Sequence, residues 1–299
     1  MSWMPRSVRG CVRTRPVTPR SGRSRWMARI STVLGTATPR LVLFSAMTHR
    51  GPGSAAVTVA QVQVPVGTKE TTQVPALAGR IEDLAGALVT VDAAHTSAAT
   101  ARYLVQDAAA DYLMTTKSQR SALYAAALKT GLELITGTEP GHTCEERGHG
   151  RISRWTTWTT GLPPGSEIAR RLPHTTRFAV IRRDTADLNR RPRTKEFAFI
   201  ATSRPSLDAA GISRHTRGHW GIENLSHRAR DTIRHEDQHQ AHTGNGPQAM
   251  ATLRNLALGL LTLHGTTKTK QTIQAIGRNP TRAIPLITQR HRPPDSRRL

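Results

Sequence analysis

The first 69 residues contain no aspartate or glutamate, and the first acidic residue is Glu70. The chain of 299 residues has only two cysteines, Cys11 and Cys144, and 4% of its residues are aromatic. Two cysteines exclude a disulfide framework and a cysteine quartet for zinc. No uninterrupted apolar run is long enough to cross a bilayer, so we expect no membrane-spanning segment.

Positive charge is abundant instead. The chain has 43 Lys and Arg against 20 Asp and Glu, a formal net charge of +23. A surplus of this size attracts polyanions and accelerates encounter with them. We therefore expect nucleic acid as the first partner to consider, and an anionic membrane surface as the second.

Changes in composition along the chain predict five segments. Residues 1–40, rich in Arg, Ser, Thr and Pro, read as a disordered basic segment because they lack apolar periodicity. Residues 41–131 alternate β-type runs and helical patterns, which is typical of an α/β core. Residues 132–205 read as a β-rich insertion, residues 206–264 as a helical part of the core, and residues 265–299 as a basic tail.

Two charged residues follow expected buried strands. Asp92 follows the apolar run "ALVTV", and Lys117 follows "DYLMTT". Open α/β sheets place their sites at the carboxyl ends of strands, so Asp92 is a candidate site residue. The alternative is that Asp92 caps a following helix and Lys117 is a solvated strand end.

The stretch "RGHWGIENLSHRARDTIRHED" (217–237) mixes a carboxylate, Glu223, with histidines and arginines. Its end contains His235-Glu-x-x-His239, a local pattern of zinc proteases. No acid follows Asp237 until Asp295, and a glycine-rich stretch follows soon after, so a third zinc ligand is missing. The histidine pair alone does not support a zinc hydrolase.

The longer run from 217 to 261 closely resembles the C-terminal signature of DDE transposases of the ISAs-type insertion sequences, the group that includes the H-repeat-associated proteins. The matching positions are Arg217, His219, Trp220, Ile222, Glu223, Asn224, Asp231, Glu236, Asp237, Thr243, Gly244, Asn245 and Pro247. Weaker likeness runs back through "EFAFIATS", "DYLMTTKSQRSAL" and "VTVDAAHT" to about Leu41.

This resemblance implies an RNase H-like (DDE) core with a β-rich insertion. It implies that three carboxylates hold two Mg²⁺ (or Mn²⁺) ions, which activate water and a DNA 3′-hydroxyl against a phosphodiester. Carried over residue by residue, Asp92 is the second carboxylate and Glu223 the third. The DNA contacts that we expect on the same grounds are Lys117, Arg217, His219, Trp220, Asn224 and Arg230. A homo-oligomer acting on insertion-sequence ends and target DNA, in the bacterial cytoplasm at the nucleoid, is also implied.

The chain departs from the family at the first carboxylate. The family's Asp-Gly-Lys on the first strand has no counterpart before Leu41, and "RTRPVTPRSGRSR" has no apolar run. We therefore expect the first strand to be missing and the copy to be N-terminally truncated or frameshifted. Trp26, Met27 and Ala28 must be encoded by TGG ATG GCN, and reading from the third base gives GAT GGC, Asp-Gly. Out-of-frame translation of residues 1 to about 38 is one hypothesis, and a genuine basic DNA-binding arm is the alternative.

The functional prediction is a DDE-type transposase that cleaves DNA phosphodiesters and transfers strands by two-metal chemistry. Its activity is expected to be impaired or absent, because the first catalytic aspartate is missing. The alternative is a non-catalytic basic DNA-binding remnant of a transposase.

Overall fold

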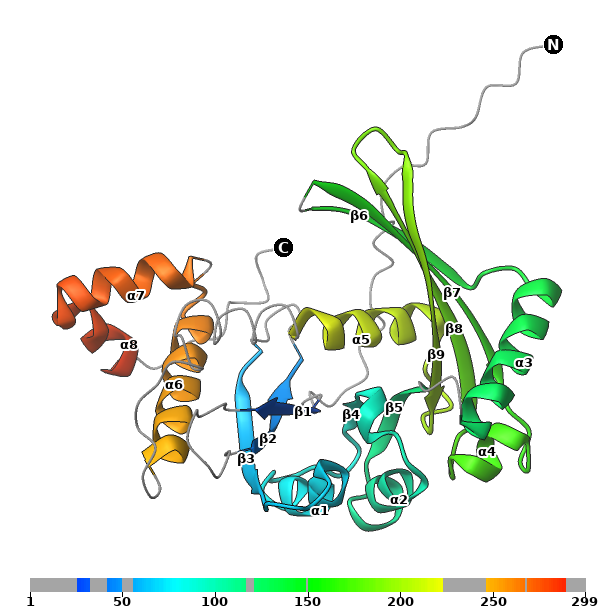
Figure 1. Ribbon diagram of the computed structural model, residues 1–299, viewed down its shortest axis with the longest axis horizontal. Coiled ribbons are helices and arrows are strands. Elements are labelled where there is room, and N and C mark those ends of the chain that lie inside the picture. Colours follow the sequence, from blue (N-terminus) through cyan, green and yellow to red (C-terminus); the bar gives the residue numbers. More distant parts are fainter. Residues whose placement is uncertain are drawn as a thin grey trace.

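The computed structural model describes residues 26–32, 42–49, 56–116, 121–148, 150–222, 246–266 and 268–288. Their strands form a single nine-stranded sheet with the order β3-β2-β1-β4-β5-β9-β8-β7-β6 (Figure 1). The strands are β1 (Trp26–Thr32), β2 (Val42–Thr48), β3 (Thr58–Val64), β4 (Leu88–Val91), β5 (Asp111–Thr116), β6 (His142–Gly148), β7 (Arg151–Gly161), β8 (Arg177–Asp187) and β9 (Pro192–Thr202).

The first five strands form a mixed sheet. β1 pairs antiparallel with β2 and parallel with β4; β2 pairs antiparallel with β3, and β4 parallel with β5. β1 thus lies at the centre of this half, between the second and fourth strands. This is the strand order of the RNase H-like core, so the expected α/β, RNase H-like fold class is confirmed.

The expectation that the first strand is missing is wrong. Residues 26–32, within the segment expected to be disordered, form β1, and all seven pair with β2, from Trp26↔Thr48 to Thr32↔Val42. The sequence WMARIST has no long apolar run, but β2 and β4 offer it a hydrogen-bonding edge on each side. The codons that hide Asp-Gly in another frame lie at the start of this strand.

The helices α1 (Val74–Ala78) and α2 (Ala98–Arg102), the latter continued by the π-helical turn η3 (Tyr103–Asp107), lie against the core half, with 3₁₀ turns η1 (Glu70–Gln73) and η2 (Ala93–His95). The longer helix α3 (Ala122–Gly137) packs mainly on β7 to β9. α3 continues through Gly131 to Gly137. A Cβ at Gly131 would lie 2.6 Å from Cε1 of Phe199, so this glycine allows close packing of helix on sheet instead of capping the helix.

The other half is a set of four long antiparallel strands, β6 to β9, with the short helix α4 (Glu167–Arg171) between β7 and β8. Alternate residues of these strands face opposite sides. Trp158, Phe178 and Val180 pack with α3, whereas Trp155 and Ile181 pack in the cluster that contains Ile212 of α5 (Ala209–Ile222).

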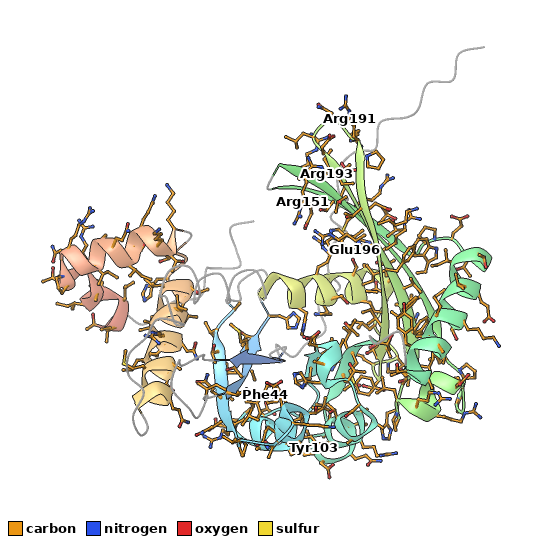
Figure 2. The ribbon with its side chains drawn as sticks, in the orientation of Figure 1. Phe44, Tyr103, Arg151, Arg191, Arg193 and Glu196 are labelled. Carbon is orange, nitrogen blue, oxygen red and sulfur yellow. The ribbon has the colours of Figure 1, made fainter. Side chains whose placement is uncertain are left out.

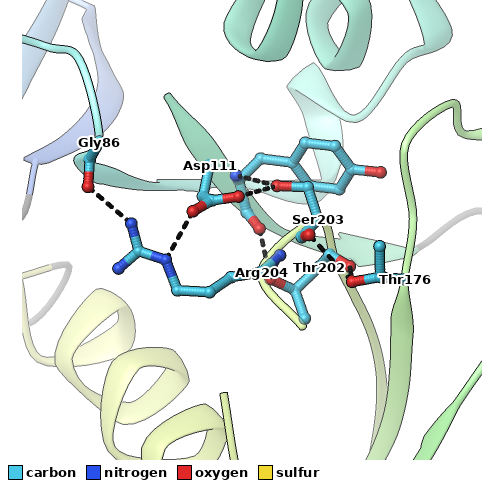
Figure 3. Close-up of polar contacts among 7 residues, drawn as sticks. Gly86, Asp111, Thr176, Thr202, Ser203 and Arg204 are labelled. Atoms are coloured by element: carbon cyan, nitrogen blue, oxygen red, sulfur yellow. Dashed lines mark hydrogen bonds and ion pairs between the residues drawn. The ribbon is translucent and has the colours of Figure 1, made fainter. Parts of the chain in front are cut away.

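A polar network fastens the two halves where β5 meets β9. Arg204 donates from Nε to Asp111 Oδ2 at 2.6 Å and from Nη2 to the carbonyl of Gly86 at 2.7 Å (Figure 3). Ser203 donates from Oγ to the other carboxylate oxygen of Asp111 at 2.8 Å. Both oxygens of Asp111 are therefore bonded, and the antiparallel strand β9 is held in register against β5.

The chain ends in a group of helices beside β3. They are α6 (Gly246–Leu263), α7 (Thr269–Arg278), the 3₁₀ turn η7 (Pro280–Ala283) and α8 (Ile284–Thr288), so part of the expected basic tail is helical. α6 packs on the sheet through Ala251, which contacts Leu43, and through Gly259 near Val57. Among the described helices, none combines the length and apolarity needed to span a membrane.

Candidate functional site

Asp92 directly follows β4, whose four residues are all buried. Its Oδ1 accepts a hydrogen bond of 2.6 Å from the backbone N–H of Ala93, and Asp92 is the N-cap of η2. The capping interpretation of Asp92 is therefore confirmed. The described bond uses Oδ1 alone, which leaves Oδ2 open to another ligand, so capping and a site role are compatible.

His95 lies three residues beyond Asp92 and is almost fully buried, with its ring 5.0 Å from the ring of Phe44. Among the described residues, neither of its ring nitrogens has a hydrogen-bond partner. Burial lowers the pKa of His95 below its usual 6.5, and the negative charge of Asp92 opposes this only in part. A neutral imidazole next to the candidate carboxylate is therefore favoured.

Two buried histidines flank Thr90, two residues before Asp92. The Thr90 hydroxyl lies 2.9 Å from Nε2 of His49 and 3.0 Å from Nδ1 of His219. His49 follows β2, and His219 belongs to the last described turn of α5. His219 is only 5% exposed. Three elements that are far apart in the sequence therefore meet at one hydroxyl group.

Arg217, another expected DNA contact, has its guanidinium engaged within the protein. It forms an ion pair with Glu146, donates from Nη1 to Sγ of Cys144 at 3.0 Å, and lies 5.8 Å from the ring centre of Trp155. Its side chain is 24% exposed. In this arrangement Arg217 fastens α5 to β6 and β7, and a DNA contact through Arg217 stays a prediction.

The remaining predicted site residues are outside the part of the chain whose side chains the structure describes. Glu223, Asn224, Arg230 and Lys117 are outside the described residues, and for Trp220 only the place of its backbone in α5 is described. The predicted meeting of Asp92 and Glu223 therefore remains a prediction. Ile222, immediately before Glu223, is the last described residue of α5.

The described residues alone do not complete a metal site. No three His, Cys, Asp or Glu side chains within the described ranges come together in a way that could hold a metal ion. β1 supplies no carboxylate, and its residues aligned with the end of β4 are Met27, beside Thr90, and Ala28, beside Val91. Neither side chain carries the oxygen ligand that Mg²⁺ prefers.

A basic arm forms a second candidate site. We define it as residues 145–154 and 182–196, the distal parts of the β6–β7 and β8–β9 hairpins, which project from the rest of the sheet (Figures 1 and 2). It contains nine Arg and Lys against five Asp and Glu. By contrast, residues 56–116 of the core contain three Arg and Lys against six Asp and Glu. The positive charge is therefore concentrated away from the core.

Ion pairs use only part of this charge. Glu145, Asp184 and Glu196 bind Arg190, Arg182 and Arg183 in ion pairs of 2.8 to 3.5 Å. The exposed basic side chains of the arm that have no ion pair among the described residues are Arg147, Arg151, Arg154, Arg191, Arg193 and Lys195. Figure 2 shows Arg151, Arg191 and Arg193 at the projecting end of the hairpins. None of these residues is among the predicted DNA contacts, although the run "RRPRTK" (190–195) indicates a basic surface here.

Comparisons with known proteins identify a family for this chain. The family model described as "Transposase DDE domain" matches residues 46–260, well over half of the chain. Among solved structures, the chain is similar to a piggyBac transposase in a synaptic complex with hairpin DNA, with 10% sequence identity and a TM-score of 0.41. The similarity covers 83% of this chain and 48% of that chain, so this chain spans about half the length of that transposase. A search of curated proteins finds no match.

Proposed function

The chain belongs to the DDE transposase family, and from that premise we propose that it descends from an enzyme that cleaved DNA phosphodiesters and transferred strands, with a catalytic site that is now impaired. The observation that carries the proposal is the position of Asp92. It follows the buried strand β4, next to β1, and among the described residues only one of its carboxylate oxygens accepts a hydrogen bond. Open α/β sheets bind their ligands at this edge.

The DDE family generally uses divalent metal ions, and Asp92 and Glu223 are the residues that would hold Mg²⁺ or Mn²⁺ here. When bound, such an ion would lower the pKa of an attacking water or 3′-hydroxyl and stabilise the leaving oxygen. The chain's own contribution is to fix the carboxylate of Asp92 through its bond to Ala93 and to keep His95 neutral beside it.

The impairment follows from β1. Where the family has an acid, β1 has the sequence WMARIST, and its only charged residue is the cation Arg29. Two carboxylates hold a hard divalent cation less well than three carboxylates. We therefore expect weak or absent cleavage.

A supercoiled-plasmid nicking assay with Mg²⁺ or Mn²⁺ tests this proposal. The full chain is compared with Glu223→Gln and Asp92→Asn, which keep side-chain size and remove charge. We expect little or no nicking by any of the three proteins. Robust nicking that disappears in both variants would show that the site is complete despite β1, whereas nicking that both variants retain would place the chemistry elsewhere.

The basic arm supports DNA as the partner. Its unpaired arginines lie on exposed strands, and a two-stranded β-ribbon fits the major groove of duplex DNA. The same arm favours the second candidate function, a non-catalytic DNA-binding remnant, if the nicking assay is negative and DNA binding persists. Either activity would take place in the bacterial cytoplasm at the nucleoid, and an active form would act as a homo-oligomer on paired DNA ends.

We also propose that the chain is a frameshifted member of the ISAs-type branch of the family. The density of matching positions between Arg217 and Pro247 supports the ISAs-type branch. The hidden Asp-Gly lies at the start of the strand where the family has its first aspartate, which supports a frameshifted copy. The nucleotide sequence upstream of codon 41 tests the frameshift. A shifted frame that encodes no β-type run before Asp-Gly would rule it out.

A further inference from the structure

Resting on the proposed function, we propose that Thr90, His49 and His219 form a positioning clamp that ties the last described turn of α5 to β4, the strand that Asp92 directly follows. The clamp is the pair of contacts of the Thr90 hydroxyl, 2.9 Å to Nε2 of His49 and 3.0 Å to Nδ1 of His219. All three side chains are at most 7% exposed, so water does not compete for these bonds.

The chemistry of the hydroxyl makes the arrangement specific. A threonine hydroxyl has one proton and two lone pairs, so it can donate to at most one of the two ring nitrogens, and at least one ring must donate its N–H to the oxygen. An isosteric valine would leave both nitrogens buried without this partner, which costs more than the loss of an exposed hydrogen bond.

Residues of α5 restrict the position of the His49 ring. The ring of His215, one helical turn before His219, lies 5.6 Å from the ring of His49 in an edge-on orientation. A Cβ added at Gly218 would lie 2.7 Å from Nδ1 of His49, so the helix backbone approaches closely there because residue 218 has no side chain. His49 therefore has little room to rotate away from Thr90.

The sequence positions of the clamp give it its role. Thr90 lies two residues before Asp92 in the same chain segment, and His219 lies four residues before Glu223. The bond between Thr90 and His219 therefore fixes the end of β4, and with it Asp92, relative to the last described turn of α5. The three side chains are buried and bond to one another, so we assign them as positioning residues and not as catalytic residues.

The test compares Thr90→Val with Thr90→Ser, which retains the hydroxyl, in the full chain. Hydrogen exchange is measured for the amides of α5 (209–222), with those of α3 (122–137) as the internal reference. We expect Val to speed exchange in α5 by about tenfold or more while α3 is unchanged, and Ser to leave both near the parent values. Faster exchange of α3 and α5 together would show a global loss of stability and would overturn the clamp, as would equal exchange in the two variants.

A proximity measurement separates failure of the clamp from failure of the proposed function. In the double variant Asp92→Cys/Glu223→Cys, the rate of disulfide formation reports how often the two positions meet. We expect Thr90→Val to slow this rate several-fold and Thr90→Ser to preserve it. An unchanged rate with Val overturns the clamp alone, whereas no disulfide in any background overturns the shared carboxylate site and the clamp with it.

A second pair of variants covers the case in which Thr90→Val does not fold. His219→Asn places an amide group near the position of Nδ1 and can still bond to Thr90, whereas His219→Leu cannot. We expect Asn to keep both the α5 protection and the disulfide rate, and Leu to lower both. Equal behaviour of Asn and Leu would contradict the proposal.

Discussion

Removing three arginines from the basic arm is expected to change how DNA binding responds to salt. The variant is Arg151→Gln, Arg191→Gln and Arg193→Gln, chosen because all three side chains are exposed and have no ion pair among the described residues. If each arginine neutralises one phosphate, the slope of log K against log salt becomes less steep by about 2.7, from about 0.9 per contact. Between 50 and 200 mM salt, the parent should then lose about 40-fold more affinity than the variant.

The measurement is equilibrium binding of a fluorescent 30-base-pair duplex over a salt series. A matched control removes the same net charge at exposed positions outside the arm, by Arg80→Gln, Arg102→Gln and Lys129→Gln. Both variants have the same net charge, so any difference between them reports location and not total charge. We expect the control to keep the parent slope.

Two results would refute the reasoning. If the arm variant keeps the parent slope, these arginines do not contact phosphates. If the control variant loses as much slope as the arm variant, DNA responds to the overall charge of the chain and not to the arm.

Two further predictions concern the packing and charge state of the core. Gly131→Ala should lower the free energy of unfolding by about 1–3 kcal/mol, because its Cβ would meet Cε1 of Phe199 at 2.6 Å in a closely packed site. Gly137→Ala, in the same helix with nothing within 4 Å of its Cβ, is the control in urea denaturation, and an equal loss in both variants would contradict this account. Because burial holds the pKa of His95 below 6.5, the unfolded chain binds more protons there, and the free energy of unfolding should fall as pH drops below that value. His95→Gln should flatten this dependence when stability is compared at pH 7.5 and 5.5, and an unchanged slope would show that another group titrates.

The local parts of this protein were predictable from its sequence. The run "LVTV" forms a strand whose four residues are all buried, as expected for a short and mostly apolar, β-branched segment. The acid that follows such a strand lies at the end of β4, where Asp92 is found. The resemblance of the run from 217 onward to DDE transposases also predicted the family that the match over residues 46–260 shows. These features depend on neighbouring residues in the chain, so sequence reasoning reaches them.

The tertiary structure decided the rest, because the decisive partners are distant in sequence. The segment WMARIST becomes a strand only because β2 and β4, which follow it in the chain, leave a central position with two hydrogen-bonding edges. The rotation of α5 about its own axis determines that His219 faces Thr90 and that Arg217 faces Glu146 and Trp155. The pairing of two hairpins gathers the unpaired arginines on one projecting arm. The sequence determines which groups each of these side chains can bind. The packing of sheet and helix determines which side chains are buried and which are exposed to a partner.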